Sequence, residues 1–581
     1  MQFVTARFEP RWRLYISSEV DDAVAAAPKF TEAGLALPSG AAAEAVEIDF
    51  SGERVNFNLA FGKTFPVKTH ALFVGRLVAD ADGVVMIGAG ADWWWSCWVD
   101  GEKVFDRGER YANGNASSIF AKHAWVFPVK VPEGANDIVF HLVSGQFWSF
   151  GAGVIPAMAG LEFREQPPPA PEALEGLRLV GNTTRDPVSY GVGEEMEFVF
   201  ELDDPRGASG DGLFLMWFAN GDDGATDSGI APISVAAPVR VRTRLARPGF
   251  VHVYAKLVNS CGLAIGNDAR LCFDGGAGAD IGALRPAATR PADFDAYWER
   301  QRARLDAVPP EAVCEEYLGA CFPDGVRIPD GLRIYKVRVA CAGPNPVTGL
   351  LAVPKDGGRH PARVIFDGYS KEPKLSHRLM TPGVVTFHVN AHGYELFRGP
   401  QYYADFFLPF ETKCSYGISP EENADPDTSY FNGMALRVMR AFDFIRTRPE
   451  WNGRDLFAMG GSQGGLQAIW AASLVPDLTR CECSINWCSN IAGADLDARL
   501  PGWNPPYVRG LDYYDTVFHA ARIPATCFVD VQRVGLGDYT CPPSGVTAMY
   551  NAIPGPRRIA YYQNSTHMYV QPEPTLARRW N

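Results

Sequence analysis

One short segment constrains the fold of the second half of this chain. The sequence Gly460-Gly461-Ser462-Gln463-Gly464 follows an apolar run at 455–459 and precedes a helical run at 466–472. This order predicts a strand, a sharp turn and a helix, and a serine on such a turn projects its hydroxyl from the sheet toward a general base. Ser462 is therefore the candidate nucleophile. Because three glycines in five residues also arise by chance, an ordinary glycine-rich turn is the alternative.

A nucleophilic serine needs a histidine and an acid, and in α/β-hydrolases the acid follows the serine and the histidine comes last. A strand predicted at 525–531 leads into a turn-rich segment that ends at Asp538. A second predicted strand leads into His567, the one histidine after Asp538. This order predicts that His567 takes the Ser462 proton while Asp538 fixes the imidazole tautomer. Asp530 is the alternative acid.

Motifs around these residues recur together in one known family. Its members carry a Gly-Gly-Ser-Gln-Gly-Gly turn, as at 460–465, and a Gly-Leu-x-Asp segment running into Pro-Pro-Ser, as at 535–544. Residues 291–298 are similar to the Pro-x-Asp-Phe-Asp-x-x-Trp signature that opens the catalytic domain of the family. Residues 290–581 thus resemble the acetyl xylan esterase and cephalosporin C deacetylase group, carbohydrate esterase family seven. The resemblance implies a serine esterase that needs no cofactor and no metal.

Acyl transfer also requires hydrogen-bond donors for the oxyanion. One donor is expected to be the backbone N–H of Gln463, directly after the nucleophile. The resemblance implies that the second comes from a Gly-Tyr pair after the predicted strand at 363–366, which here is Gly368-Tyr369. Asp367 stands where members of the family usually carry histidine.

Three further residues are candidates for substrate contact. His392 lies in the segment 390–394, where better-known members show Arg-Gly-Gln-Gly, a loop that shapes the pocket and the oligomer in relatives. A hydrogen bond from His392 to the backbone is the favoured alternative. Tyr430 and Trp487 lie on segments where α/β-hydrolases build the walls of the acyl pocket, and their rings suit a small acyl group.

The composition of the chain excludes several classes of function. The chain has 581 residues, a net charge of −13 and 47% hydrophobic residues, enough for three domains. An acidic chain without Lys/Arg-rich runs lacks the basic surface that nucleic acid requires, and no apolar stretch reaches membrane-spanning length. The N-terminus lacks a signal peptide's apolar core, so the chain as written is expected to be cytoplasmic, or secreted or periplasmic if a leader is missing. The twelve cysteines show no metal spacing and are expected to be free thiols.

Composition also predicts domain boundaries. A proline-rich connector at 166–171 and a glycine-rich stretch at 275–279, interpreted as flexible, divide the chain into 1–166, 173–274 and 288–581. Alternating apolar residues predict β-sandwiches for the first two domains, the first galactose-binding-like and the second immunoglobulin-like. The run Trp93-Trp94-Trp95 sends rings to both faces of a strand, so at least one ring is expected in the core.

In the third domain, alternating strands and helices predict a mostly parallel, doubly wound α/β-hydrolase sheet. A helix before residue 446 has one apolar face, and three arginines are expected to lie away from it: Arg437, Arg440 and Arg446.

The sequence therefore predicts a three-domain serine esterase that removes acetyl or other short acyl groups from carbohydrate hydroxyls. Its expected partner is an acetylated oligo- or polysaccharide. The sequence leaves open whether the chain also forms a homo-oligomer. Two alternatives remain. A prolyl-oligopeptidase-like peptidase also joins a β domain to a similar turn, although no propeller repeat is visible. A glycan-binding protein with an inactive hydrolase domain is the other, with tryptophans of the first domain stacking on sugars.

Overall fold

The computed structural model describes residues 2–16, 44–50, 54–62, 65, 68–91, 94–107, 124–144, 149–156, 176–204, 212–260, 262–265, 269–371, 377–411, 415–568, 570 and 578–580. Residues 1–247 and 251–279 form one compact unit, and residues 248–250 and 280–581 form a second, called here the hydrolase unit. The proline-rich connector expected at 166–171 lies outside the described residues. Within these ranges, no helix is long and apolar enough to cross a membrane.

The first unit begins with two antiparallel sheets. One has the strand order β3 (Glu44–Asp49), β2 (Arg11–Ile16), β5 (His70–Ala79), β10 (Gly134–Val143), β7 (Trp95–Val99) and β8 (Glu102–Arg107), with β1 (Ala6–Phe8) paired to β5. The other has the order β4 (Arg54–Asn56), β11 (Ser149–Ile155), β6 (Gly83–Ala91) and β9 (Trp125–Val131). A short helix, α2 (Phe57–Phe61), follows β4.

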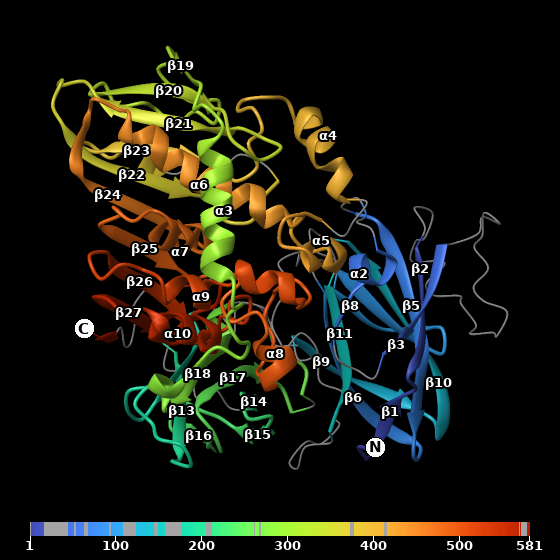
Figure 1. Ribbon diagram of the computed structural model, residues 1–581. Helices are drawn as coiled ribbons and strands as arrows, with labels where there is room; N and C mark the ends of the chain where they lie inside the picture. The colour runs from blue at the N-terminus through green and yellow to red at the C-terminus, as the bar shows by residue number, and fades with distance from the viewer. Residues whose placement is uncertain are drawn as a thin grey trace. The chain divides into compact units, whose positions relative to one another are not determined.

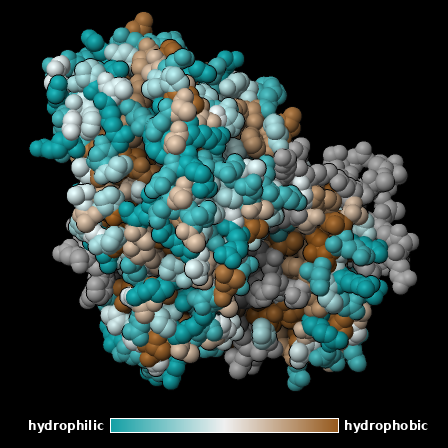
Figure 2. Space-filling model, viewed as in Figure 1, coloured by the Kyte–Doolittle hydropathy of each residue, from teal (hydrophilic) through white to brown (hydrophobic). Residues whose placement is uncertain are grey.

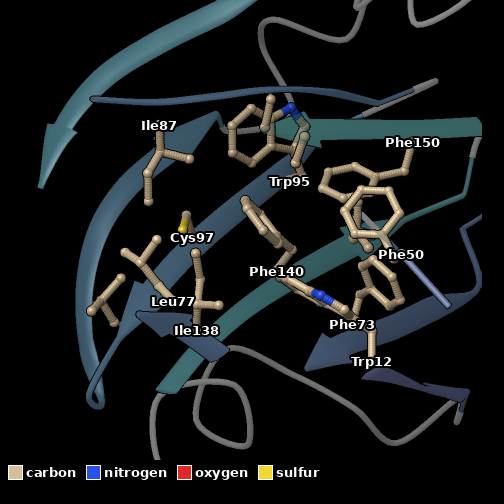
Figure 3. Packing of buried hydrophobic residues seen from close by; sticks show 14 of the residues in the cluster. Trp12, Phe50, Phe73, Leu77, Ile87, Trp95, Cys97, Ile138, Phe140 and Phe150 are labelled. Atoms are coloured by element: carbon tan, nitrogen blue, oxygen red, sulfur yellow. The ribbon is translucent and has the colours of Figure 1, made fainter. Parts of the chain in front are cut away.

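Aromatic rings fill the core between these two sheets, as Figure 3 shows. Trp95 is fully buried, and its ring lies 6.0 Å from that of Phe140, so the expectation of a core ring in the tryptophan run is confirmed. Trp94 is only partly buried, and Trp93 lies outside the described residues. The other large rings labelled in this core are Trp12, Phe50, Phe73 and Phe150.

A second pair of antiparallel sheets completes the first unit. One has the order β12 (Arg178–Thr183), β13 (Met196–Asp203) and β16 (Val239–Thr243). The other has the order β15 (Thr226–Pro232), β14 (Phe214–Gly221), β17 (Gly249–Val258) and β18 (Cys272–Ala279), with the turn η4 (Ala269–Leu271) before β18.

Strand β18 corrects one expectation. The stretch 275–279, interpreted from its glycines as flexible, is the buried end of this strand. Glycine and alanine suit it because small residues also let a strand pack closely against the facing sheet.

The hydrolase unit is built on one mixed sheet (Figure 1). Its strand order is β19 (Ala312–Glu316), β20 (Leu332–Val339), β21 (Val347–Pro354), β23 (Val385–Val389), β22 (His360–Phe366), β24 (Trp451–Gly461), β25 (Arg480–Ser484), β26 (Phe528–Gly535), β27 (Arg557–Tyr562) and β28 (Arg578–Trp580). The strands from β23 to β27 run parallel, and the outer pairs are antiparallel. Ligand-facing loops gather at the carboxyl ends of such parallel strands.

Helices cover this sheet. Figure 1 shows α3 (Phe294–Asp306), α6 (Tyr430–Arg446), α7 (Gln463–Leu474), α9 (Thr516–Ala520) and α10 (Pro543–Ala552) on one side of it. The remaining short elements are η5 (Ile281–Ala283), η6 (His377–Met380), α4 (Pro400–Glu411), α5 (Pro420–Ala424), α8 (Gly493–Asp497) and η7 (Arg509–Tyr513). On the face in Figure 2, hydrophilic residues predominate over this unit, with apolar residues scattered among them, as is usual for a protein surface.

Two arginines of α6, which the sequence places away from the apolar face of the helix, are nevertheless buried. Arg437 and Arg440 are each 2% exposed. Arg437 donates two hydrogen bonds to the carbonyl of Ala391, and Arg440 donates to the carbonyls of Leu305 and Val308. Neighbouring chain segments thus cover the helix on more than its apolar face, and their backbone carbonyls accept hydrogen bonds from the buried guanidinium groups.

Candidate active site

The turn between β24 and α7 holds Ser462 in a strained conformation, with φ 57° and ψ −121°. Close backbone contacts require glycine at positions 460 and 464, on either side of the serine. A Cβ on Gly460 would lie 2.3 Å from the carbonyl of Gly464, and a Cβ on Gly464 would lie 2.2 Å from the carbonyl oxygen of Phe366. The turn can therefore pack only with glycine at both positions, and strain of this kind persists where the surrounding structure fixes it.

Ser462, His567 and Asp538 form one hydrogen-bonded line. The Nε2 atom of His567 lies 3.1 Å from Oγ of Ser462, and its Nδ1 atom lies 3.0 Å from Oδ2 of Asp538. The Asp538 side chain is fully buried, and its Oδ1 atom accepts hydrogen bonds from the backbone N–H groups of Thr540 and Cys541 at 3.0 and 2.9 Å. These bonds fix the carboxylate, which in turn orients the imidazole toward the serine.

Close packing between two loops brings His567 and Asp538 together. A Cβ on Gly535 would lie 2.4 Å from the carbonyl oxygen of Ser565, and the N–H of Gly537 donates to that oxygen at 3.0 Å. The Gly-Leu-Gly-Asp motif is thus a site of close backbone approach.

Arg533 adds a support that sequence reasoning missed. Its guanidinium donates to the carbonyl of His567 at 2.9 Å. Arg533 lies on β26, the strand that leads to Asp538, so one strand fixes both the acid and the backbone of the histidine. Its position near the end of that strand was the only sequence signal.

Asp530, the alternative acid, has other partners. It is 1% exposed, and both of its carboxylate oxygens accept hydrogen bonds from the guanidinium of Arg558. A second guanidinium, that of Arg480, lies 3.6 Å from Oδ2. This ion-pair network accounts for Asp530 without a catalytic role.

The second half of this chain is similar to known proteins. A family model described as acetyl xylan esterase (AXE1) matches residues 279–494 and 505–577. The hydrolase unit belongs to the acetyl xylan esterase family. Acetyl esterase Axe7A of Xylanibacter ruminicola is 28% identical over 288 residues, which are 47% of this chain and 63% of that protein. The chain thus spans less than two thirds of the length of this curated relative.

Two solved acetyl xylan esterases are also similar to part of this chain. The enzyme from Paenibacillus sp. R4 is 22% identical, with a TM-score of 0.40 over 50% of this chain and 94% of the other. Acetyl xylan esterase 1 from Thermoanaerobacterium sp. JW/SL YS485 is 21% identical, with a TM-score of 0.40 over 50% of this chain and 93% of the other.

The two segments expected to form the oxyanion hole of this family lie beside the nucleophile. Gln463 is the first residue of α7 and is fully buried. A Cβ on Gly368 would lie 3.9 Å from the Cβ of Ser462, which places the Gly368-Tyr369 loop next to the serine. The loop after β22 and the start of α7 therefore flank Ser462.

Asp367, where family members usually have histidine, pairs with His388 on β23. Oδ1 of Asp367 lies 2.7 Å from Nε2 of His388. Both residues line a cavity of ≈ 280 Å³ whose walls include Leu350, Phe397 and Tyr403 and whose lining does not include Ser462. The Asp367 side chain thus belongs to a cavity separate from the hydrogen-bonded line.

Aromatic rings form a wall next to the serine. Trp487 is fully buried, and its backbone N–H donates to the carbonyl of Ser462 at 3.2 Å. Its ring stacks on that of Trp503, with centroids 5.1 Å apart, and meets the ring of Tyr369 edge-on at 5.4 Å. These three rings thus form one packed aromatic cluster on loops that contact Ser462 or neighbour it.

His392 and Tyr430 lie behind that wall. His392 is 2% exposed, its Nδ1 atom lies 2.8 Å from the hydroxyl of Tyr430, and its Nε2 atom lies 2.9 Å from the carbonyl of Ser370. Burial lowers the pKa of His392 to about 3, so the ring is neutral at pH 7. Because a carbonyl only accepts, Nε2 carries the hydrogen and Nδ1 accepts from Tyr430.

Proposed function

We propose that this protein is a serine esterase that removes acetyl or other short acyl groups from carbohydrate hydroxyls. The observation that carries the proposal is the line from Ser462 through His567 to Asp538, with separations of 3.1 and 3.0 Å on a strained turn. Membership of the acetyl xylan esterase family and a relative named acetyl esterase support the choice of acyl group.

In the proposed mechanism, Ser462 attacks the ester carbonyl while His567 removes its proton. Asp538 holds the imidazole in the required tautomer and stabilises the imidazolium. His567 then protonates the leaving sugar oxygen, and an acetyl-enzyme remains. Water, activated by the same imidazole, attacks this intermediate and releases acetate. The reaction needs neither a cofactor nor a metal.

The backbone N–H groups of Gln463 and Tyr369 stabilise the oxyanion in both steps. Losing one such donor typically costs about 2.7 to 4 kcal/mol of transition-state stabilisation. The positions of α7 and of Gly368 beside Ser462 support this assignment.

The substrate is an acetylated oligo- or polysaccharide. The stacked rings of Trp487 and Trp503 and the edge-on ring of Tyr369 favour a small acyl group, because these bulky rings pack together on loops around Ser462. His392 and Tyr430 support this wall from behind through their bonds to Ser370 and to each other.

The two pairs of antiparallel sheets support a galactose-binding-like domain at 1–166 and an immunoglobulin-like domain at 173–274, ahead of a catalytic domain at 288–581. Burial of Trp95 favours a structural role for that ring over sugar binding.

A parallel assay of the full chain on p-nitrophenyl acetate, acetylated xylan and a chromogenic peptide amide tests the proposal. Acetate release from the first two substrates, without peptide cleavage, is expected. Cleavage of the peptide alone would point to a peptidase, and binding of xylan without any hydrolysis would point to a glycan-binding protein.

A further inference from the structure

A single phenol hydroxyl joins the two segments that flank Ser462. Tyr416 is fully buried, and its hydroxyl accepts a hydrogen bond from the backbone N–H of Ser370 at 3.1 Å. The same hydroxyl donates to Oε1 of Gln463 at 3.0 Å. Ser370 directly follows Tyr369, and Gln463 directly follows Ser462. The hydroxyl thus connects the loop after β22 with the first residue of α7.

The ring of Tyr416 also holds the side chain of Tyr369. The two rings are stacked, with centroids 4.1 Å apart and an angle of 9° between their planes. The hydroxyl of Tyr369 donates to the carbonyl of Tyr416 at 3.1 Å and lies 2.8 Å from Oγ of Ser415. Tyr369 is therefore held at both its ring and its hydroxyl by the segment that carries Tyr416.

The loop is held on its other side by His392. The Nε2–H group of His392 donates to the carbonyl of Ser370, while the N–H of Ser370 donates to Tyr416. Both backbone groups of Ser370 are thus bonded to buried side chains. Tyr430, which donates to His392, completes a chain of contacts that ends at Gln463.

An oxyanion hole works because its donors are fixed before the reaction, at 2.7 to 3.1 Å from the developing charge. Small displacements of a donor therefore cost rate without altering ground-state binding. A buried hydroxyl that bonds to Gln463 and to the residue directly after Tyr369 is suited to set this geometry.

We propose that Tyr416 is the positioning residue of the oxyanion hole, fixing the backbone N–H groups of Tyr369 and Gln463 relative to each other. The inference rests on the proposed function. Tyr416 does not touch the reacting atoms and acts through the two donor residues.

The test compares Tyr416→Phe with the unchanged protein, using the full chain and a fluorophosphonate probe. In labelling, Oγ of Ser462 gives its proton to His567 and forms a bond to phosphorus, the P–F bond breaks and fluoride leaves, while a phosphoryl oxygen occupies the oxyanion hole. Labelling by Tyr416→Phe is expected to be about tenfold to hundredfold slower. The kcat on p-nitrophenyl acetate should fall by the same factor, while KM stays within about twofold of its original value. An unchanged labelling rate would overturn the proposal.

Tyr297→Phe is the matched control. Tyr297 is 1% exposed, and its hydroxyl bonds to Tyr514, Asn432 and the carbonyl of Pro426 on the α3 side of the unit. This variant should lose a similar amount of thermal stability and keep the original labelling rate. Equal slowing in both variants would show that Tyr416 acts only through general stability, and would overturn the proposal.

Two further comparisons keep the test decisive. If Tyr416→Phe does not fold, Tyr430→Phe removes the outer bond of the same chain and is expected to slow labelling about twofold to tenfold. A normal rate in Tyr430→Phe would then overturn the proposal. Labelling of the unchanged protein without hydrolysis of acetyl esters would contradict the proposed function alone, because the probe reports the oxyanion hole whatever the natural acyl group.

Discussion

The imidazole of His567 lies 3.1 Å from the hydroxyl of Ser462, although 105 residues separate them in the chain. They meet because β24 and β27 run parallel in one sheet, so the loops that follow them emerge at the same edge. Asp538, after β26, emerges between them and bonds to the far side of the imidazole.

Substitutions at two buried aspartates, Asp538 and Asp530, test which of them is the catalytic acid. Asp538→Asn should lower kcat on p-nitrophenyl acetate by about 10³- to 10⁴-fold, because the amide stabilises the wrong imidazole tautomer. Asp530→Asn should keep kcat and destabilise the fold by about 1–3 kcal/mol through its arginine partners. The opposite pattern in steady-state kinetics would identify Asp530 as the catalytic acid.

Acyl length tests the aromatic wall beside the nucleophile. Activity on p-nitrophenyl esters should fall about tenfold or more from acetyl to butyryl, because rings such as Trp487 leave little room for added methylenes. The measurement is kcat/KM across a series of chain lengths. Similar values for acetyl and octanoyl esters would indicate an open, lipase-like groove instead.

The pH dependence of stability tests a buried histidine away from the active site. Burial lowers the pKa of His519 to about 3, and its ring nitrogens bond to Ser473 and to the carbonyl of Tyr513. As pH falls below about 6.5, only the unfolded chain protonates this residue, so the folded state loses stability by about 1.4 kcal/mol per pH unit. In urea unfolding between pH 7 and 4, His519→Gln should lack this contribution. Identical pH dependence in both proteins would contradict the assignment.

Alanine substitutions at Trp95 and Trp94 test whether Trp95 belongs to the core between the first two sheets. Trp95→Ala should destabilise its domain by about 3–5 kcal/mol, since the fully buried ring would leave a cavity. Trp94→Ala is the neighbouring control and should cost less, because its ring is only partly buried. Thermal unfolding of the two variants gives the comparison, and equal losses would count against a core role specific to Trp95.

Local sequence motifs were enough to predict the main residues of the candidate site. The turn around Ser462 needs glycines within a few residues, so its motif is readable in sequence, and parallel strands then place Asp538 and His567 by their order alone. Sequence could not reveal Tyr416, because its partners Ser370 and Gln463 lie 46 and 47 residues away and no local pattern marks the contact.

Long-range contacts also explain what the sequence could not show. Helical periodicity places Arg437 and Arg440 away from the apolar face, but it cannot show that carbonyls from distant segments, such as that of Ala391, bury them and accept their hydrogen bonds. The glycines at 275–279 favoured a flexible segment, because the same small residues serve loops and closely packed strands such as β18.

The most direct test of the central claim is acetate release by Ser462→Ala. The full chain with this substitution should fold normally and lose nearly all hydrolysis of p-nitrophenyl acetate, because the three side chains act as a unit. Ser473→Ala, on the same helix but bonded to His519, should keep the original rate. Acetate release by Ser462→Ala at the rate of the unchanged protein would contradict the account.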